Sequence, residues 1–176
     1  MKNSLCLILS FLFVSVGHTQ LASPNESGVT FGHVHLNVSD IEEHKRIWVN
    51  HFNGTIVEKG SHSVIKLPNM LITLTQQKPT MDSIETAMHH FGFKVRRMDK
   101  FLDKWRADGL QVGSMFLGAE GQLNAYVTLP DGVEVEMQED RGLQEEITGY
   151  HVHWFVDDAV DILAWYVDMF GLEIRP

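Results

Sequence analysis

Three residues of types that bind metals stand in short segments where polar and apolar residues alternate. His33 lies in segment 31–38, His90 in segment 89–95 and Glu136 in segment 133–138. In a β-strand, successive side chains point to opposite faces, so each of the three would lie on the polar face of its strand. Two imidazoles and one carboxylate, with positions left open for substrate, form the donor set of non-haem Fe(II) sites, and the same set accepts Mn, Zn or Ni. If these polar faces line one cavity, His33, His90 and Glu136 would bind one divalent metal ion.

These segments belong to a pattern of elements that occurs twice. The first copy predicts a strand at 31–38, a helix at about 40–52, and strands at 55–59, 63–67 and 70–76. The second predicts a strand at 89–95, a helix at 98–107, and strands at 111–116, 124–128 and 133–138. Asp40 is a suitable N-cap for the first helix, and Asn53-Gly54 is typical of a helix end. We therefore expect an α+β fold in which two β-α-β-β-β modules, 28–78 and 88–140, form one domain over residues 28–140.

A third copy begins at His151 and stops early. Its strand is expected at 151–156, its helix at 158–170 and the start of its next strand at 172–174. Eight of the 24 residues from 33 to 56 are identical to the residues 118 positions later, which identifies an internal repeat. We expect residues 141–148 to be a linker and 149–176 to start a second, incomplete domain, with His151 as a ligand of that domain's own site. The alternative is a complete protein whose tail packs on a partner subunit.

The composition is that of a soluble globular protein. The 176 residues are 44% hydrophobic and 21% charged, and the chain is long enough to form one domain with its own core. The net charge is -9, and no segment concentrates Lys and Arg, which argues against nucleic acid as a partner.

The first residues are typical of a secretory signal peptide. Lys2 precedes an apolar run, Leu5 to Val16, that is too short to span a bilayer comfortably, and small residues follow it. We expect a signal peptide over residues 1–22, the alternative being an uncleaved N-terminal anchor. The single cysteine, Cys6, lies inside this segment, so the mature chain would be free of disulfides. Export without disulfides suits a secreted or periplasmic bacterial protein.

Three stretches of the sequence resemble the signatures of the vicinal-oxygen-chelate superfamily, which includes glyoxalases, bleomycin-resistance proteins and extradiol dioxygenases. They are His33-Val-His-Leu-Asn-Val-Ser-Asp40-Ile, His90-Phe-Gly-Phe-Lys-Val and Tyr126-Val-Thr-Leu-Pro-Asp-Gly-Val-Glu-Val-Glu136. The resemblance implies that two modules pair and curl into a cup-shaped mixed sheet around one metal ion held by His33, His90 and Glu136. The fourth ligand of glyoxalase I maps onto Thr73, a poor metal ligand. The pattern is therefore similar to the three-ligand sites of extradiol dioxygenases and fosfomycin-modifying transferases.

Two further histidines lie near the expected ligands. His35 shares the polar face of His33, and a neutral imidazole there would suit general acid/base catalysis, the alternative being a residue that only lines the cavity. His89 is expected on the opposite face of its strand, in a structural role.

The function expected from these features is that of a metal-dependent enzyme, of dioxygenase, lyase or transferase type, that acts on a small oxygen-bearing substrate. One alternative is a small-molecule-binding protein without catalysis, similar to bleomycin-resistance proteins. Another is a degenerate domain that supports a second, active one. The expected partners are the small-molecule substrate and either a second copy of the chain or a missing C-terminal domain. Nucleic acid and, after signal cleavage, membrane are not expected partners.

Overall fold

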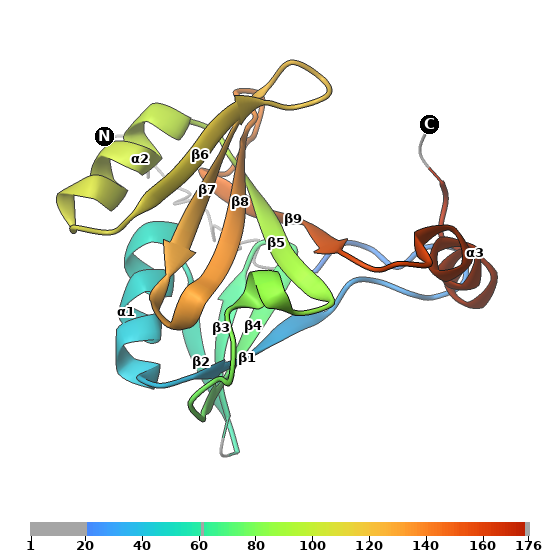
Figure 1. Cartoon of the computed structure of the whole chain (residues 1–176), viewed down its shortest axis with the longest axis horizontal. Helices are drawn as coiled ribbons and strands as arrows, with labels where there is room; N and C mark the ends of the chain where they lie inside the picture. The colour runs from blue at the N-terminus through green and yellow to red at the C-terminus, as the bar shows by residue number, and fades with distance from the viewer. Residues whose placement is uncertain (1–20, 61, 175–176) are drawn as a thin grey trace, which may run out of the picture.

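The computed structural model of the protein describes residues 21–60 and 62–174 (Figure 1). The signal peptide expected over residues 1–22 therefore falls, apart from its last two residues, outside the described part of the chain. Within the part described, none of the helices combines the length and the apolar character that crossing a membrane requires.

The observed elements follow the predicted order closely. In chain order they are β1 (His33–Val38), α1 (Ile41–Phe52), β2 (Thr55–Lys59), β3 (His62–Leu67), β4 (Met70–Gln76), the short η1 (Ser83–Glu85), β5 (Met88–Val95), α2 (Met98–Ala107), β6 (Val112–Leu117), β7 (Leu123–Leu129), the short η2 (Pro130–Gly132), β8 (Val133–Glu139), β9 (Ile147–Trp154) and α3 (Ala159–Phe170). Two predictions for the third copy were wrong: its strand begins at Ile147 and not at His151, and residues 172–174 form no strand.

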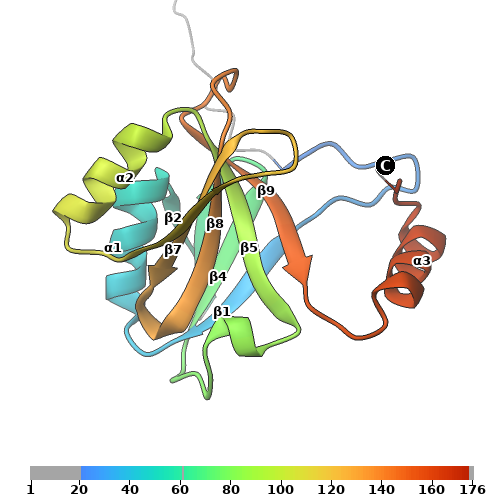
Figure 2. The same cartoon turned by 45° about the horizontal axis from the view of Figure 1, so that its top comes forward.

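The strands form two mixed sheets, which confirms the α+β class. The first sheet has the order β1-β4-β3-β2 and the second the order β6-β7-β8-β5-β9. In each module the first strand runs parallel to the last, as β1 does to β4 and β5 to β8. Strand β9, from the third copy of the repeat, pairs antiparallel with β5 and extends the second sheet (Figure 2). Two of its residues, 147 and 148, lie in the segment that we expected to be a linker.

One apolar core joins the two modules. Helices α1 and α2 lie side by side in both views (Figures 1 and 2). Aromatic residues of α1 contact those of β5. The Trp48 ring lies 6.1 Å from the ring of Phe91 and 6.0 Å from that of Phe93, and all three residues are fully buried. Alternation of apolar residues along the strands directs one face of each sheet toward this core. The opposite faces stay available for polar side chains.

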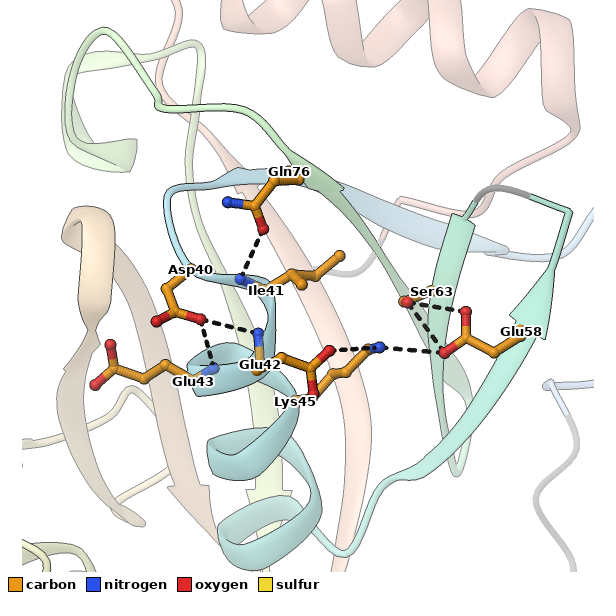
Figure 3. Close-up of polar contacts among 8 residues, drawn as sticks. All are labelled: Asp40, Ile41, Glu42, Glu43, Lys45, Glu58, Ser63 and Gln76. Atoms are coloured by element: carbon orange, nitrogen blue, oxygen red, sulfur yellow. Dashed lines mark hydrogen bonds and ion pairs between the residues drawn. The ribbon is translucent and has the colours of Figure 1, made fainter.

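The start of α1 is fixed by its own side chains and by neighbouring strands (Figure 3). The Asp40 carboxylate accepts hydrogen bonds from the backbone N–H groups of Glu42 and Glu43, as the sequence predicted for an N-cap. The Gln76 side chain, at the end of β4, accepts a hydrogen bond from the backbone N–H of Ile41. These contacts tie the start of the helix to the end of the strand that pairs with β1.

Helix α3 stands apart from both sheets (Figure 1). The helix is rich in apolar residues, yet none of its residues is buried. This confirms that no described sheet covers its apolar face. Its C-terminal end contacts the segment before β1, where the Asn25 side chain donates hydrogen bonds to the carbonyl oxygens of Phe170 and Gly171. The N-terminal segment therefore holds one end of the third copy in place.

Acid is expected to destabilise the fold through two buried histidines of α1. Burial lowers the pKa of His44 and of His51 below the ordinary value of 6.5, and their contacts with Asp131 and Asp108 offset only part of this effect. As pH falls through 6.5, the unfolded chain binds protons before the folded chain does, so stability present above this pH is lost below it. The free energy of unfolding in urea should therefore be lower at pH values below 6.5 than above it.

A His51→Gln variant is the control for this prediction, because it removes one of the two titrating groups. Its unfolding free energy should change less with pH over the same range. An equal pH dependence in both proteins would show that His51 does not contribute.

Candidate metal centre

Three neighbouring strands of the second sheet bring a carboxylate and two imidazoles together. In the described residues, the group with metal-binding spacing is His90 of β5, Glu136 of β8 and His151 of β9, whose ligand atoms all lie within 4.8 Å of one another. The strand register explains this meeting, because Gly92 of β5 pairs with Glu136 on one side and with His151 on the other. The Glu136 and His151 side chains therefore meet above Gly92, which has no side chain. His90 lies two positions before Gly92, on the same face of β5.

The contacts within this cluster are short. His90 Nε2 lies 2.9 Å from Glu136 Oε2, and His151 Nε2 lies 3.2 Å from the same oxygen. The other carboxylate oxygen, Oε1, accepts a hydrogen bond of 2.6 Å from the Asn124 amide. Asn124 therefore orients the carboxylate so that one oxygen faces both imidazoles. His90, Glu136 and Asn124 are buried, while the His151 side chain is 27% exposed and lies on the solvent side of the cluster.

The electrostatics keep the carboxylate ionised. Burial on its own would raise the pKa of Glu136, but hydrogen bonds with His151, His90 and Asn124 outweigh burial and lower the pKa well below its usual range. An ionised carboxylate that faces two imidazoles can bind a cation in place of their protons.

The donor set and its spacing fit one divalent ion. Metal–ligand distances of about 2.0–2.2 Å place neighbouring ligand atoms of a single ion roughly 2.8–3.5 Å apart. The two N–O distances of 2.9 Å and 3.2 Å already fall in this range. The His90, Glu136 and His151 side chains could therefore hold an ion without a large rearrangement.

Other side chains border the cluster. The His153 ring lies 4.6 Å from the His90 ring, and the half-buried Tyr126 ring lies 5.2 Å from it. Burial, with a further contribution from His90 and His151, lowers the pKa of His153. Burial, followed by the charges of Glu136 and Glu134, raises the pKa of Tyr126. Both groups are therefore expected to be neutral near pH 7.

Gly92 is expected to control access of the His151 ring to this cluster. A Cβ atom at position 92 would lie only 2.8 Å from both ring nitrogens of His151. The ring is the free end of a side chain and can turn away, so a Gly92→Ala variant should fold while His151 is displaced. We expect this variant to lose most of its affinity for Zn²⁺ and to keep an unfolding transition close to that of the wild type.

Zinc titration followed by urea unfolding tests this prediction. Gly113→Ala, on β6, is the matched control, because a Cβ there would meet Tyr126 at 3.3 Å and not His151. Equal zinc affinity in the Gly92→Ala variant and the wild type would contradict the role given to Gly92.

The structure brings together two of the three ligands predicted from the sequence. His90 and Glu136 lie in the cluster, but His33 lies on the exposed face of β1, outside it. His35 is also exposed on β1, where its Nε2 atom lies 2.7 Å from the Thr75 hydroxyl and its ring 6.1 Å from that of His62. Thr73, also on the first sheet, pairs with His35 in the register of β1 and β4.

His151 was predicted from the sequence to be a ligand in a second, incomplete domain. His151 repeats His33, and the third copy was expected to start a separate domain. In the structure β9 pairs with β5, so His151 lies beside His90. The repeated His-Val-His sequence was the feature that could have predicted this position. It makes the strands that carry His33 and His151 equivalent candidates for pairing with β5.

Comparison with known proteins identifies relatives of this fold. The family described as the Glyoxalase/Bleomycin resistance protein/Dioxygenase superfamily matches residues 30–137. No curated protein matches the chain. Among solved structures, a fosfomycin resistance protein, FosX, from Listeria monocytogenes is similar at 18% identity and a TM-score of 0.54, over 65% of this chain and 93% of the other.

Two other similar structures are a glyoxalase family protein and a lyase. The glyoxalase family protein from Enterococcus faecalis has 20% identity and a TM-score of 0.51, over 61% of this chain and 94% of the other. A lactoylglutathione lyase from Agrobacterium tumefaciens has 18% identity and a TM-score of 0.50, over 66% and 97%. The family match ends at residue 137, before β9, so it includes His90 and Glu136 but not His151.

Proposed function

Since the chain belongs to the Glyoxalase/Bleomycin resistance protein/Dioxygenase superfamily, we propose that it is a metal-dependent enzyme that acts on a small oxygen-bearing molecule. The observation that carries the proposal is the cluster of His90, Glu136 and His151, which would hold the ion. Two of the similar structures are named as a fosfomycin resistance protein and a lactoylglutathione lyase, and these names support small-molecule chemistry on this fold. The metal is one that accepts nitrogen and oxygen donors together, such as Fe, Mn, Zn or Ni.

The residues of the chain have separate roles in this proposal. Glu136 and the two histidines bind the ion, and Asn124 holds the carboxylate in orientation. A substrate would approach from the partly exposed side of His151, while His153 and Tyr126 lie beside the His90 ring. A divalent ion held at such a site polarises substrate oxygen atoms and stabilises negative charge that develops on them.

The third ligand of the ion, beside His90 and Glu136, could come from either of two histidines. The superfamily pattern and the sequence favour His33, whereas the distances favour His151. We adopt His151 because its ring nitrogen is already 3.2 Å from the shared carboxylate oxygen. We also propose that the protein is secreted or periplasmic, on the strength of the apolar segment within residues 1–22.

Metal analysis of the purified protein tests the proposed function. After reconstitution with each candidate metal and removal of excess ion, we expect close to one equivalent of metal per chain. Less than about a tenth of an equivalent for every metal would contradict the proposal.

Turnover of the metal-loaded protein would be assayed with catechols and O₂, with glutathione hemithioacetals, and with fosfomycin and a thiol. Binding of these compounds that is indifferent to a chelator, without turnover, would favour a binding protein without catalysis.

A further inference from the structure

His89, the neighbour of His90 in the sequence, contacts the side of the His90 ring that faces away from the cluster. The Nδ1 atoms of the two rings lie 2.9 Å apart. His90 Nε2 is engaged with Glu136 at the same time. Both nitrogens of this buried imidazole therefore have a partner within the protein, and His89 is one of them.

An irregularity in β5 explains how two consecutive residues of a strand can meet. Successive side chains of a regular strand point to opposite faces, so the sequence predicts His89 on the face opposite His90. The pairing of β5 with β9 shifts register between Met88 and His90, so His89 has no paired residue in this ladder. Such a bulge redirects side chains, and here the two rings lie edge to face with centroids 5.2 Å apart. The expectation for His89 was therefore wrong.

The two ring nitrogens of a metal-binding histidine differ in protonation. A neutral imidazole carries one proton, and the nitrogen that binds a metal must be the one without it. If Nε2 of His90 binds the ion, the proton must be on Nδ1, and this buried N–H needs an acceptor. His90 is only 1% exposed, so water cannot easily supply one. The Nδ1 atom of His89 is at the right distance to accept it.

We propose that His89 is a positioning residue that fixes the orientation and the tautomer of His90, so that Nε2 of His90 is free to bind a metal ion. This inference rests on the proposed function, because it assigns a role within the same site. His89 acts through His90 and does not itself touch the ion. Its half-buried ring is held in place by the edge of His90 and by the Phe155 ring, 5.8 Å away.

An imidazole suits this role because it can either donate or accept. Without metal, a proton on His90 Nε2 would face the Glu136 carboxylate oxygen 2.9 Å away, and His90 Nδ1 would then accept a hydrogen bond from His89. With a metal bound to Nε2, the proton would be on His90 Nδ1, which would donate to His89. The number of protons on the pair stays the same, since His89 changes from the Nδ1–H to the Nε2–H tautomer as His90 changes in the opposite sense. A backbone carbonyl could serve only the second arrangement.

Zinc affinity measured in three variants tests this inference. His89→Phe keeps a planar ring but cannot make the hydrogen bond, and it should weaken binding by about 10- to 100-fold, as loss of a partner behind a metal-binding histidine does in other sites. His89→Asn keeps a group that can donate or accept, and it should recover most of the affinity. His153→Phe is the matched control, because His153 also contacts the His90 ring but has no hydrogen bond to it in the described structure, and its affinity should stay near that of the wild type.

The outcomes separate this inference from the proposed function. Absence of zinc binding in the wild type would overturn the proposed function, and the role of His89 with it. Wild-type binding with equal affinity in His89→Phe would overturn only the inference. A loss in His89→Phe that His89→Asn does not restore would also overturn it, because it would indicate lost packing. Urea unfolding of the metal-free variants and the absorption spectrum of bound Co²⁺ supply readouts of folding and of ligand geometry that do not depend on activity.

Discussion

Replacement of His151 by alanine is expected to remove high-affinity metal binding, whereas the same replacement of His33 should leave it unchanged. His151 supplies one of three donors in the cluster, and its Nε2 atom lies 3.2 Å from Glu136 Oε2. Loss of a hydrogen bond that supports a ligand lowers metal affinity by roughly 10- to 100-fold, and loss of a direct ligand should lower it further. His33 is exposed on β1 and lies outside the cluster.

The comparison is well controlled because the two histidines occupy equivalent positions of the repeat. Each opens a His-Val-His sequence on a strand, and neither is buried. Calorimetric titration with Zn²⁺ of both variants, together with urea unfolding, would separate lost ligation from lost folding. The opposite result, with binding lost in His33→Ala and kept in His151→Ala, would mean that β1 and not β9 approaches the cluster in solution.

Replacement of Trp48 by alanine is expected to cost about 3–5 kcal/mol of unfolding free energy. The Trp48 ring is fully buried and lies 4.4 Å from the Phe52 ring of its own helix. It also contacts Phe91 and Phe93 of β5, so it joins the core of the first module to that of the second. A loss of this size is a large share of the 5–15 kcal/mol typical of a whole domain.

Trp165→Ala on α3 is the matched control for the Trp48 variant. Trp165 is 52% exposed, and its removal should change the free energy of unfolding by no more than about 0.5 kcal/mol. Urea unfolding followed by far-ultraviolet circular dichroism suits both variants, because the signal does not depend on tryptophan. A similar loss in both would mean that α3 is covered in solution.

Local features of the sequence were sufficient to place most of the elements. Alternation predicted the strands of both modules, and apolar spacing predicted α2 with the bounds that the structure has. Asp40 as N-cap and Asn53 at the end of α1 were also predicted, and the structure places Asn53 in the left-handed conformation, with φ of 56°. These features depend on a few neighbouring residues, which is why a single sequence reveals them.

The contacts of the candidate site were harder to predict, because they join distant parts of the chain. The bulge at His89 and the approach of His151 above Gly92 both depend on the pairing of β5 with β9. Trp154 is 45% exposed although it is a large aromatic residue on a strand, because it is the last residue of β9. A pattern of residue types indicates which face is polar, but not which strand lies beside it.

The sequence by itself determined the types of element, the polar and apolar faces of the regular strands, and the kind of donor that could bind a metal. It also made His33 and His151 equivalent candidates, since both begin the same repeated His-Val-His sequence. Only the tertiary structure decided which of them lies beside His90, by pairing β9 with β5 and leaving β1 at the edge of the other sheet. The physical reason is that backbone hydrogen bonds between strands are nearly independent of side chains, so the choice of neighbour depends on how the whole core packs.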